Sequence, residues 1–126
     1  MGIFRRKPPK PPWHQWVAQA KGQQTTASNL IEENAAHPSV RRASEEGKLA
    51  KAMTRLDFAA KSLHGAYRAG ASCEEIAREW LGDDDPGSVE RVRAVLEDGA
   101  ALRQGYADAL PDMALPDTGW HESALS

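Results

Sequence analysis

The chain has 126 residues, which is enough for one small domain with a modest core and too few for two large domains. Charged residues make up 27% and hydrophobic residues 40%, but only 6% are aromatic and the mean hydropathy is −0.61, which predicts a thin core in a polar chain. Cys73 is the single cysteine, which excludes an internal disulfide and favours a reducing, cytoplasmic setting. No run of about 18 apolar residues occurs, so we expect no membrane span.

The net charge of −2 conceals an asymmetry between the two ends of the chain. Residues 1–31 carry five Lys/Arg and no Asp/Glu, whereas residues 71–126 carry four Lys/Arg and thirteen Asp/Glu. Such a difference predicts that one end meets a charged partner, or that it folds back on the opposite end.

Residues 1–28 are expected to form a basic, mostly disordered arm. The segment RRKPPKPP has four prolines in eight residues, which favours an extended backbone. Trp13 and Trp16 then begin a short helix or anchor the arm on the domain. The arm's cations would suit the minor groove of DNA or an anionic lipid surface, and we take them as candidate nucleic-acid contacts: Arg5, Arg6, Lys7 and Lys10.

Residues 29–110 are expected to form an all-α domain. Asn29 followed by Glu32 predicts the start of a short helix that ends near His37. From Pro38 to about residue 69 a long helix is predicted, because its apolar residues recur at alternating steps of three and four: Leu49, Met53, Leu56, Ala60, Leu63 and Tyr67. This seam spans about three heptads, so it would either pair with a second copy in a homodimer or be buried within the domain.

Two further helices are predicted from their start signals. Ser72 with Glu75 forms a capping box that starts a helix at Cys73, and Asp85 before Pro86 starts the next. Asp98 and Gly99 break or weaken this second helix, after which helical spacing continues until Pro111. Residues 111–126 are acidic and proline-punctuated, and they are predicted to be a disordered tail in which Trp120 is a candidate docking residue.

The stretch YRAGASCEEIAREW…GSVERVRAVLEDGAALR, residues 67–103, resembles the helix-turn-helix DNA-binding domains of small bacterial regulators. The resemblance implies a positioning helix from Cys73 to Leu81 and a recognition helix from Pro86 to Glu97. It implies that the residues nearest DNA are Ser88, Glu90, Arg91 and Arg93.

An acidic turn and a basic stripe on the long helix would suit different partners. Asp83, Asp84 and Asp85 occupy the turn before the expected recognition helix, where they stabilise the helix dipole but repel phosphates. They are therefore also a candidate surface for a basic protein partner. A basic stripe follows the long helix, which is either a solvated face or a phosphate-binding one: Arg41, Lys48, Lys51 and Arg55.

No pattern of residues indicates catalysis, a cofactor or a metal ion. The four histidines are scattered and no phosphate-binding glycine loop is present. The sequence therefore predicts a non-enzymatic binding protein. The first hypothesis is a DNA-associated regulator or accessory protein that uses the helix-turn-helix-like unit and the basic arm. The second is a protein-interaction adaptor whose acidic C-terminal half docks on a basic partner or imitates DNA.

Overall fold

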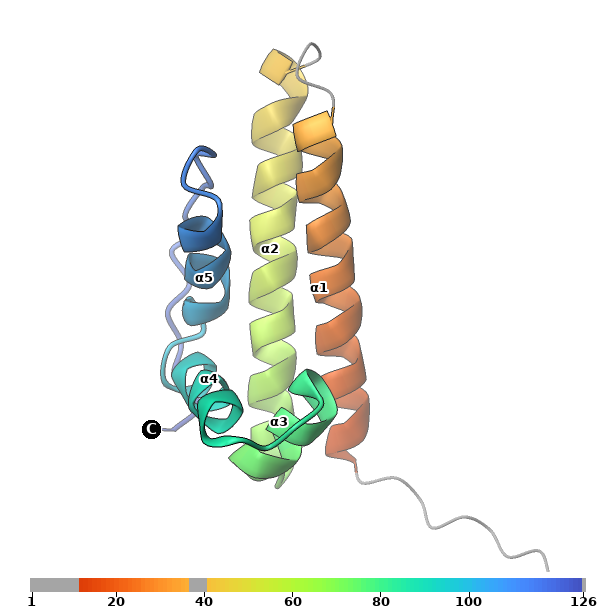
Figure 1. Ribbon diagram of the computed structural model, residues 1–126, viewed down its shortest axis with the longest axis vertical. Coiled ribbons are helices and arrows are strands. Elements are labelled where there is room, and N and C mark those ends of the chain that lie inside the picture. The colour runs from red at the N-terminus through yellow and green to blue at the C-terminus, as the bar shows by residue number, and fades with distance from the viewer. Residues whose placement is uncertain (1–11, 37–40, 126) are drawn as a thin grey trace, which may run out of the picture.

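The computed structural model describes residues 12–36 and 41–125, and the side chains of residues 12–34 and 47–125. Within these residues the chain is all helical, as expected, with no strands (Figure 1). The helices are α1 Trp13–Ala36, α2 Arg41–Arg68, α3 Cys73–Leu81, α4 Pro86–Glu97 and α5 Ala101–Ala109.

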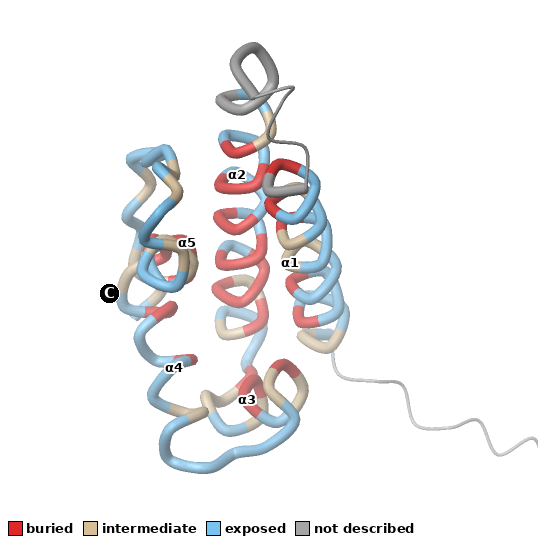
Figure 2. The backbone as a smooth tube through the Cα atoms, turned by 45° about the horizontal axis from the view of Figure 1, so that its top comes forward, coloured by how far each residue is buried: buried red, intermediate tan, exposed pale blue. Residues whose placement is uncertain are grey.

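Helices α1 and α2 form a long antiparallel pair, and α2 lies between α1 and the C-terminal helices (Figure 1). The buried residues of α1 recur at steps of three, four and seven along one stripe: Val17, Ala20, Ala27, Ile31 and Asn34. Figure 2 shows burial along most of α2, whereas the outer side of α1 is exposed. The core therefore follows α2.

The boundary expected after residue 28 is wrong for the described part of the chain. Asn29 is not an N-cap, because it lies inside α1, and the helix begins at Trp13 instead. The sequence predicted a short helix ending near His37 and, as one alternative, another beginning at Trp13, but not their union, because the buried stripe of α1 contains mostly alanine and polar residues, a weak apolar signal. Packing against α2 supplies the stability that such a helix lacks alone.

The predicted seam of α2 is buried inside the chain. Leu49, Met53, Leu56, Ala60 and Leu63 are at most 6% exposed. The seam packs in one core cluster with α1, α3 and α4, so the intramolecular alternative holds and this stripe is not available for pairing with a second copy.

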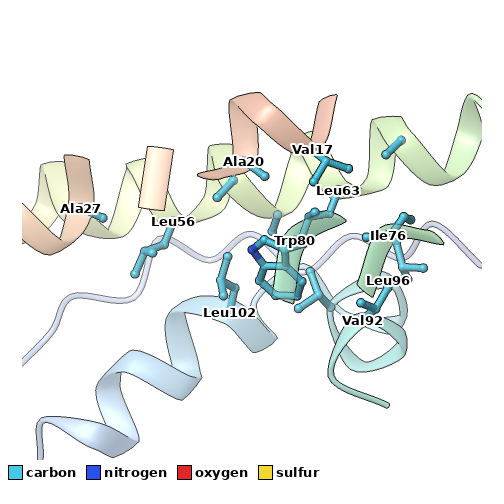
Figure 3. Close-up of a cluster of buried hydrophobic side chains, with 14 of the residues drawn as sticks. Val17, Ala20, Ala27, Leu56, Leu63, Ile76, Trp80, Val92, Leu96 and Leu102 are labelled. Atoms are coloured by element: carbon cyan, nitrogen blue, oxygen red, sulfur yellow. The ribbon is translucent and has the colours of Figure 1, made fainter. Parts of the chain in front are cut away.

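The predicted helix signals after residue 70 are confirmed. Ser72 Oγ accepts a hydrogen bond from the Glu75 amide, and the Ser72 amide donates to the Glu75 carboxylate, both at 3.1 Å. Gly82 ends α3 in the left-handed conformation, with φ of 87°. Trp80 from α3 lies among Leu63 of α2, Val92 of α4 and Leu102 of α5, so α3 closes one end of the core (Figure 3).

The segment after α5 has no regular secondary structure, as expected, but it is packed on the helices. It turns at the end of α5 and returns along α5 and α4 (Figure 1). The Gly99 amide donates to the Glu122 carbonyl at 2.8 Å, and the Ala124 amide donates to the Leu96 carbonyl at 2.7 Å. For residues 111–125 the prediction of a disordered tail is therefore wrong, because side chains distant in sequence hold them in place.

Candidate nucleic-acid interface

Two of the three aspartates in the turn between α3 and α4 bind neighbouring residues of the same chain. The Asp83 carboxylate accepts hydrogen bonds from Ser88 Oγ at 2.6 Å and from the Asp85 amide at 3.1 Å, and these bonds lower the pKa of Asp83. Asp84 pairs with Arg78 of α3 at 3.0 Å. An ionised carboxylate thus occupies the Ser88 hydroxyl that was expected to meet a phosphate.

The two arginines expected to contact DNA point to different neighbours. They are two residues apart on α4, so they project from different sides of the helix. Arg91 lies 5.8 Å above the ring of Trp80, and Arg93 lies 3.8 Å from Glu90 on its own helix. Ser88, Arg91 and Arg93 therefore do not converge on one phosphate- or base-binding position.

The basic stripe of α2 borders α1. Lys48 pairs with Glu33 of α1 at 3.7 Å, and Arg55 donates to the Gln23 side chain at 3.3 Å. Lys51 is exposed between them. Arg41 begins α2, but its side chain lies outside the described part of the structure, as do the arm residues Arg5, Arg6, Lys7 and Lys10.

Two exposed aromatic rings extend the basic stripe toward the start of α1. Trp16 is 41% exposed and Phe58 is 42% exposed. Both line one surface hollow of about 380 Å³, which we call the aromatic–cationic face: Trp16, Gln19, Gln23, Arg55, Phe58, Lys61 and Ser62. The face combines flat apolar rings with guanidinium and ammonium groups.

The rings of this face are held by their neighbours. The Trp16 ring lies across Gly65 of α2 so closely that a Cβ atom at Gly65 would stand 2.7 Å from it. Lys61 Nζ is 5.2 Å from the centre of the Phe58 ring and 5.0 Å from that of Trp120. Sequence analysis missed Phe58, although its position off the buried seam and three residues after Arg55 is a readable signal.

A buried ion pair ties the C-terminal segment to α2 beside this face. Arg103 of α5 is 4% exposed and donates to Asp57 at 2.8 Å, to Asp117 at 2.6 Å and to the Trp120 carbonyl at 2.9 Å. The Thr118 hydroxyl donates to the second oxygen of Asp57. Burial lowers the pKa of Arg103, but the hydrogen bonds that its guanidinium donates to the Asp117 and Asp57 carboxylates outweigh this effect, so the pKa is raised and the guanidinium stays charged.

His64 is the one fully buried histidine of the described chain. Its Nε2 atom lies 2.7 Å from the Val95 carbonyl, and Nδ1 has no hydrogen-bond partner among the described residues. Burial lowers the pKa of His64, with Arg68 acting in the same direction and the Val95 bond opposing both. The ring is 5.4 Å from that of Trp120. It is therefore a neutral packing residue under the C-terminal segment.

Over residues 12–36 and 41–125, no cluster of His, Cys, Asp and Glu could hold a metal ion. Among the described helices, none is both long enough and apolar enough to cross a membrane.

The fold and face define an all-α protein with a candidate binding surface on its long helix pair. No protein-family model matches the chain, and no curated protein or solved structure is detectably similar to it.

Proposed function

We propose that this chain is a small, non-enzymatic DNA-associated accessory or regulatory protein that binds single-stranded DNA through the aromatic–cationic face. One observation carries the proposal: Trp16 and Phe58 are exposed around a single hollow that also contains Arg55 and Lys61. Unpaired bases stack on such rings while cations neutralise the adjacent phosphates. Paired bases in a duplex do not offer their faces in this way.

The charges around the face support the same proposal. Lys48, Lys51 and Arg55 continue the cationic surface along α2 from the two rings. The basic arm precedes α1, so its four cations are tethered within about ten residues of Trp16. This surface replaces the helix-turn-helix-like unit as the main contact, because Ser88, Arg91 and Arg93 each have a different neighbour.

The test is fluorescence anisotropy of labelled random-sequence DNA, single-stranded and duplex, at about 50 and 200 mM salt. We expect the single strand to bind more tightly. Phe58→Leu should weaken its binding by about 1–3 kcal/mol, the worth of one stacked base, with little change in folding since the ring is exposed. Failure of the full chain to bind either DNA at low salt would refute the proposed function.

A matched pair of double variants distinguishes the two candidate surfaces. Arg55→Gln with Lys61→Gln removes two charges from the face, and Arg91→Gln with Arg93→Gln removes two from α4. The first should reduce the salt slope for single-stranded DNA by about 1.4, because each phosphate contact contributes about 0.7, while the second leaves it unchanged. The reverse result would return the interface to the helix-turn-helix-like unit. Arg5, Arg6, Lys7 and Lys10 changed together to Ala would measure the arm's share of the slope.

The acidic turn supports a second candidate function, a protein-interaction adaptor. Asp83, Asp84 and Asp85 are all exposed on one short turn in the acidic half of the chain. Replacing the three with Asn should weaken the capture of a basic partner protein, or of a protein that this surface attracts by imitating DNA. Undiminished capture of basic proteins from the native lysate would count against this surface.

A further inference from the structure

A second hollow, unrelated to the aromatic–cationic face, lies where α1, α3, α4 and α5 meet. Its volume is about 390 Å³, within the usual range for small-molecule sites. Trp80 and Tyr106 supply aromatic walls, and Val95 and Leu102 supply aliphatic surface. We call this hollow the α4–α5 groove.

The α5 side of the groove is open because its residues are small. Ala101, Gly105 and Ala109 recur every four residues and all line the groove. A Cβ atom added at Gly105 would meet nothing within 4 Å. The space at Gly105 is therefore available to a ligand.

The aromatic walls are fixed before any ligand arrives. The Trp80 indole N–H donates to the Gln24 side-chain oxygen, and Trp80 is only 8% exposed. The Tyr106 hydroxyl lies 3.4 Å from the Ser28 hydroxyl of α1. Held rings lose little conformational freedom on binding, which favours affinity.

The polar groups around the groove are mainly hydrogen-bond donors. The Gln24 oxygen is occupied by Trp80, so its amide N–H₂ group remains to donate. Arg91 extends over the Trp80 ring and makes no ion pair within the described residues. None of the residues that line the groove is acidic. This charge balance suits an anion, and the arginine fork suits a carboxylate.

We propose that the α4–α5 groove binds a small, flat aromatic carboxylate. Its ring lies between Trp80 and Tyr106 over Gly105, and its carboxylate pairs with Arg91 and accepts from the Gln24 amide. The inference does not rest on DNA binding, because no residue is shared between this groove and the aromatic–cationic face.

The probe is 2-naphthoate, with uncharged 2-naphthalenemethanol as its matched control, titrated into the full chain and followed by two-dimensional ¹H–¹⁵N NMR. We expect saturable shifts at the Trp80 indole N–H and the Gly105 amide. Arg91→Gln should weaken naphthoate binding about tenfold and leave the alcohol unaffected, because only the ion pair is lost. Arg93→Gln, the same charge change on another side of α4, should leave both unchanged.

Gly105→Leu tests the cavity itself. The added side chain enters empty space in a helix, so the protein should stay folded by circular dichroism while binding of both probes is lost. The proposal is overturned if no saturable shift appears up to about 10 mM, weaker than any ordinary ligand site. Equal weakening by Arg91→Gln and Arg93→Gln would also overturn it, since that reports general surface charge alone.

Discussion

At the scale of single residues, Arg103 and Asp57 bury charge in the core of a small protein. Arg103→Met should lower the free energy of unfolding by on the order of 3 kcal/mol, because it leaves the Asp57 carboxylate buried without its cation. Urea denaturation measures the loss. Asp117→Asn is the control: this side chain is 72% exposed, so its removal should cost much less. Equal losses would mean that Asp57 is not the partner that matters.

His64 should make stability depend on pH. Burial lowers its pKa in the folded state below the ordinary value of 6.5, so the unfolded chain binds the proton first. Above about pH 6.5, titration of His64 should leave the free energy of unfolding unchanged. Below that pH, the free energy of unfolding should fall as the pH decreases toward the lowered pKa that His64 has in the folded state. Urea denaturation between about pH 7.5 and 5 measures this fall while the pH stays above the ordinary carboxylate pKa values of about 3.9 and 4.3.

His64→Gln provides the control for this pH dependence. Glutamine retains a donor for the Val95 carbonyl but does not titrate. The variant should therefore lose the decline between about pH 6.5 and 5. The same decline in both proteins would assign it to other groups.

At the scale of elements, α1 shows what local sequence patterns miss. Gly22 of α1 and Gly65 of α2 give a direct test of how α1 packs. Gly22 lies within α1 with open space around it, so Gly22→Ala should raise the free energy of unfolding by about 1 kcal/mol. Gly65→Ala should give no such gain, because the new methyl group would displace the Trp16 ring. Denaturant midpoints compare the two, and equal stabilisation would show that Trp16 does not lie on Gly65.

A comparison of α1 with α3 and α4 shows which helix boundaries the sequence could predict. The ends of α3 and the start of α4 were predictable because capping boxes, glycine and proline act within a few residues. The start of α1 was not, because Ala20 and Ala27 are buried by packing against other helices, chiefly α2, and not by their own sequence neighbours. The sequence placed Arg91 and Arg93 on one helix. It did not predict that Arg91 would lie over Trp80 while Arg93 pairs with Glu90.

At the scale of the whole molecule, the C-terminal segment closes the fold over α4 and α5. The Trp120 ring lies against Gly99 so tightly that a Cβ atom there would be 2.0 Å away. Gly99→Ala should expel Trp120 and destabilise the protein by about 1–3 kcal/mol, as overpacking does. Hydrogen exchange at the amides of residue 99 and Ala124 should speed up, since both donate across this contact in the unsubstituted protein.

Gly87→Ala is the control for this experiment. Gly87 lies in the first turn of α4, and an added methyl group there meets nothing within 4 Å. Its exchange pattern at the C-terminal segment should match that of the unsubstituted protein. Unchanged protection in Gly99→Ala would show that the segment is held without Trp120.

The sequence by itself determined the all-α class, the helix boundaries after residue 70, the α2 seam and the unequal charges of the two ends. Each depends on spacing along one segment or on composition, without reference to a residue distant in sequence. Only the tertiary structure decided the length of α1, the buried pair of Asp57 and Arg103, the aromatic–cationic face and the α4–α5 groove. Arg103 and Asp57 are 46 residues apart, and Gln24 and Trp80 are 56 apart. Pairings over such separations follow from how the helices pack, which no local pattern specifies.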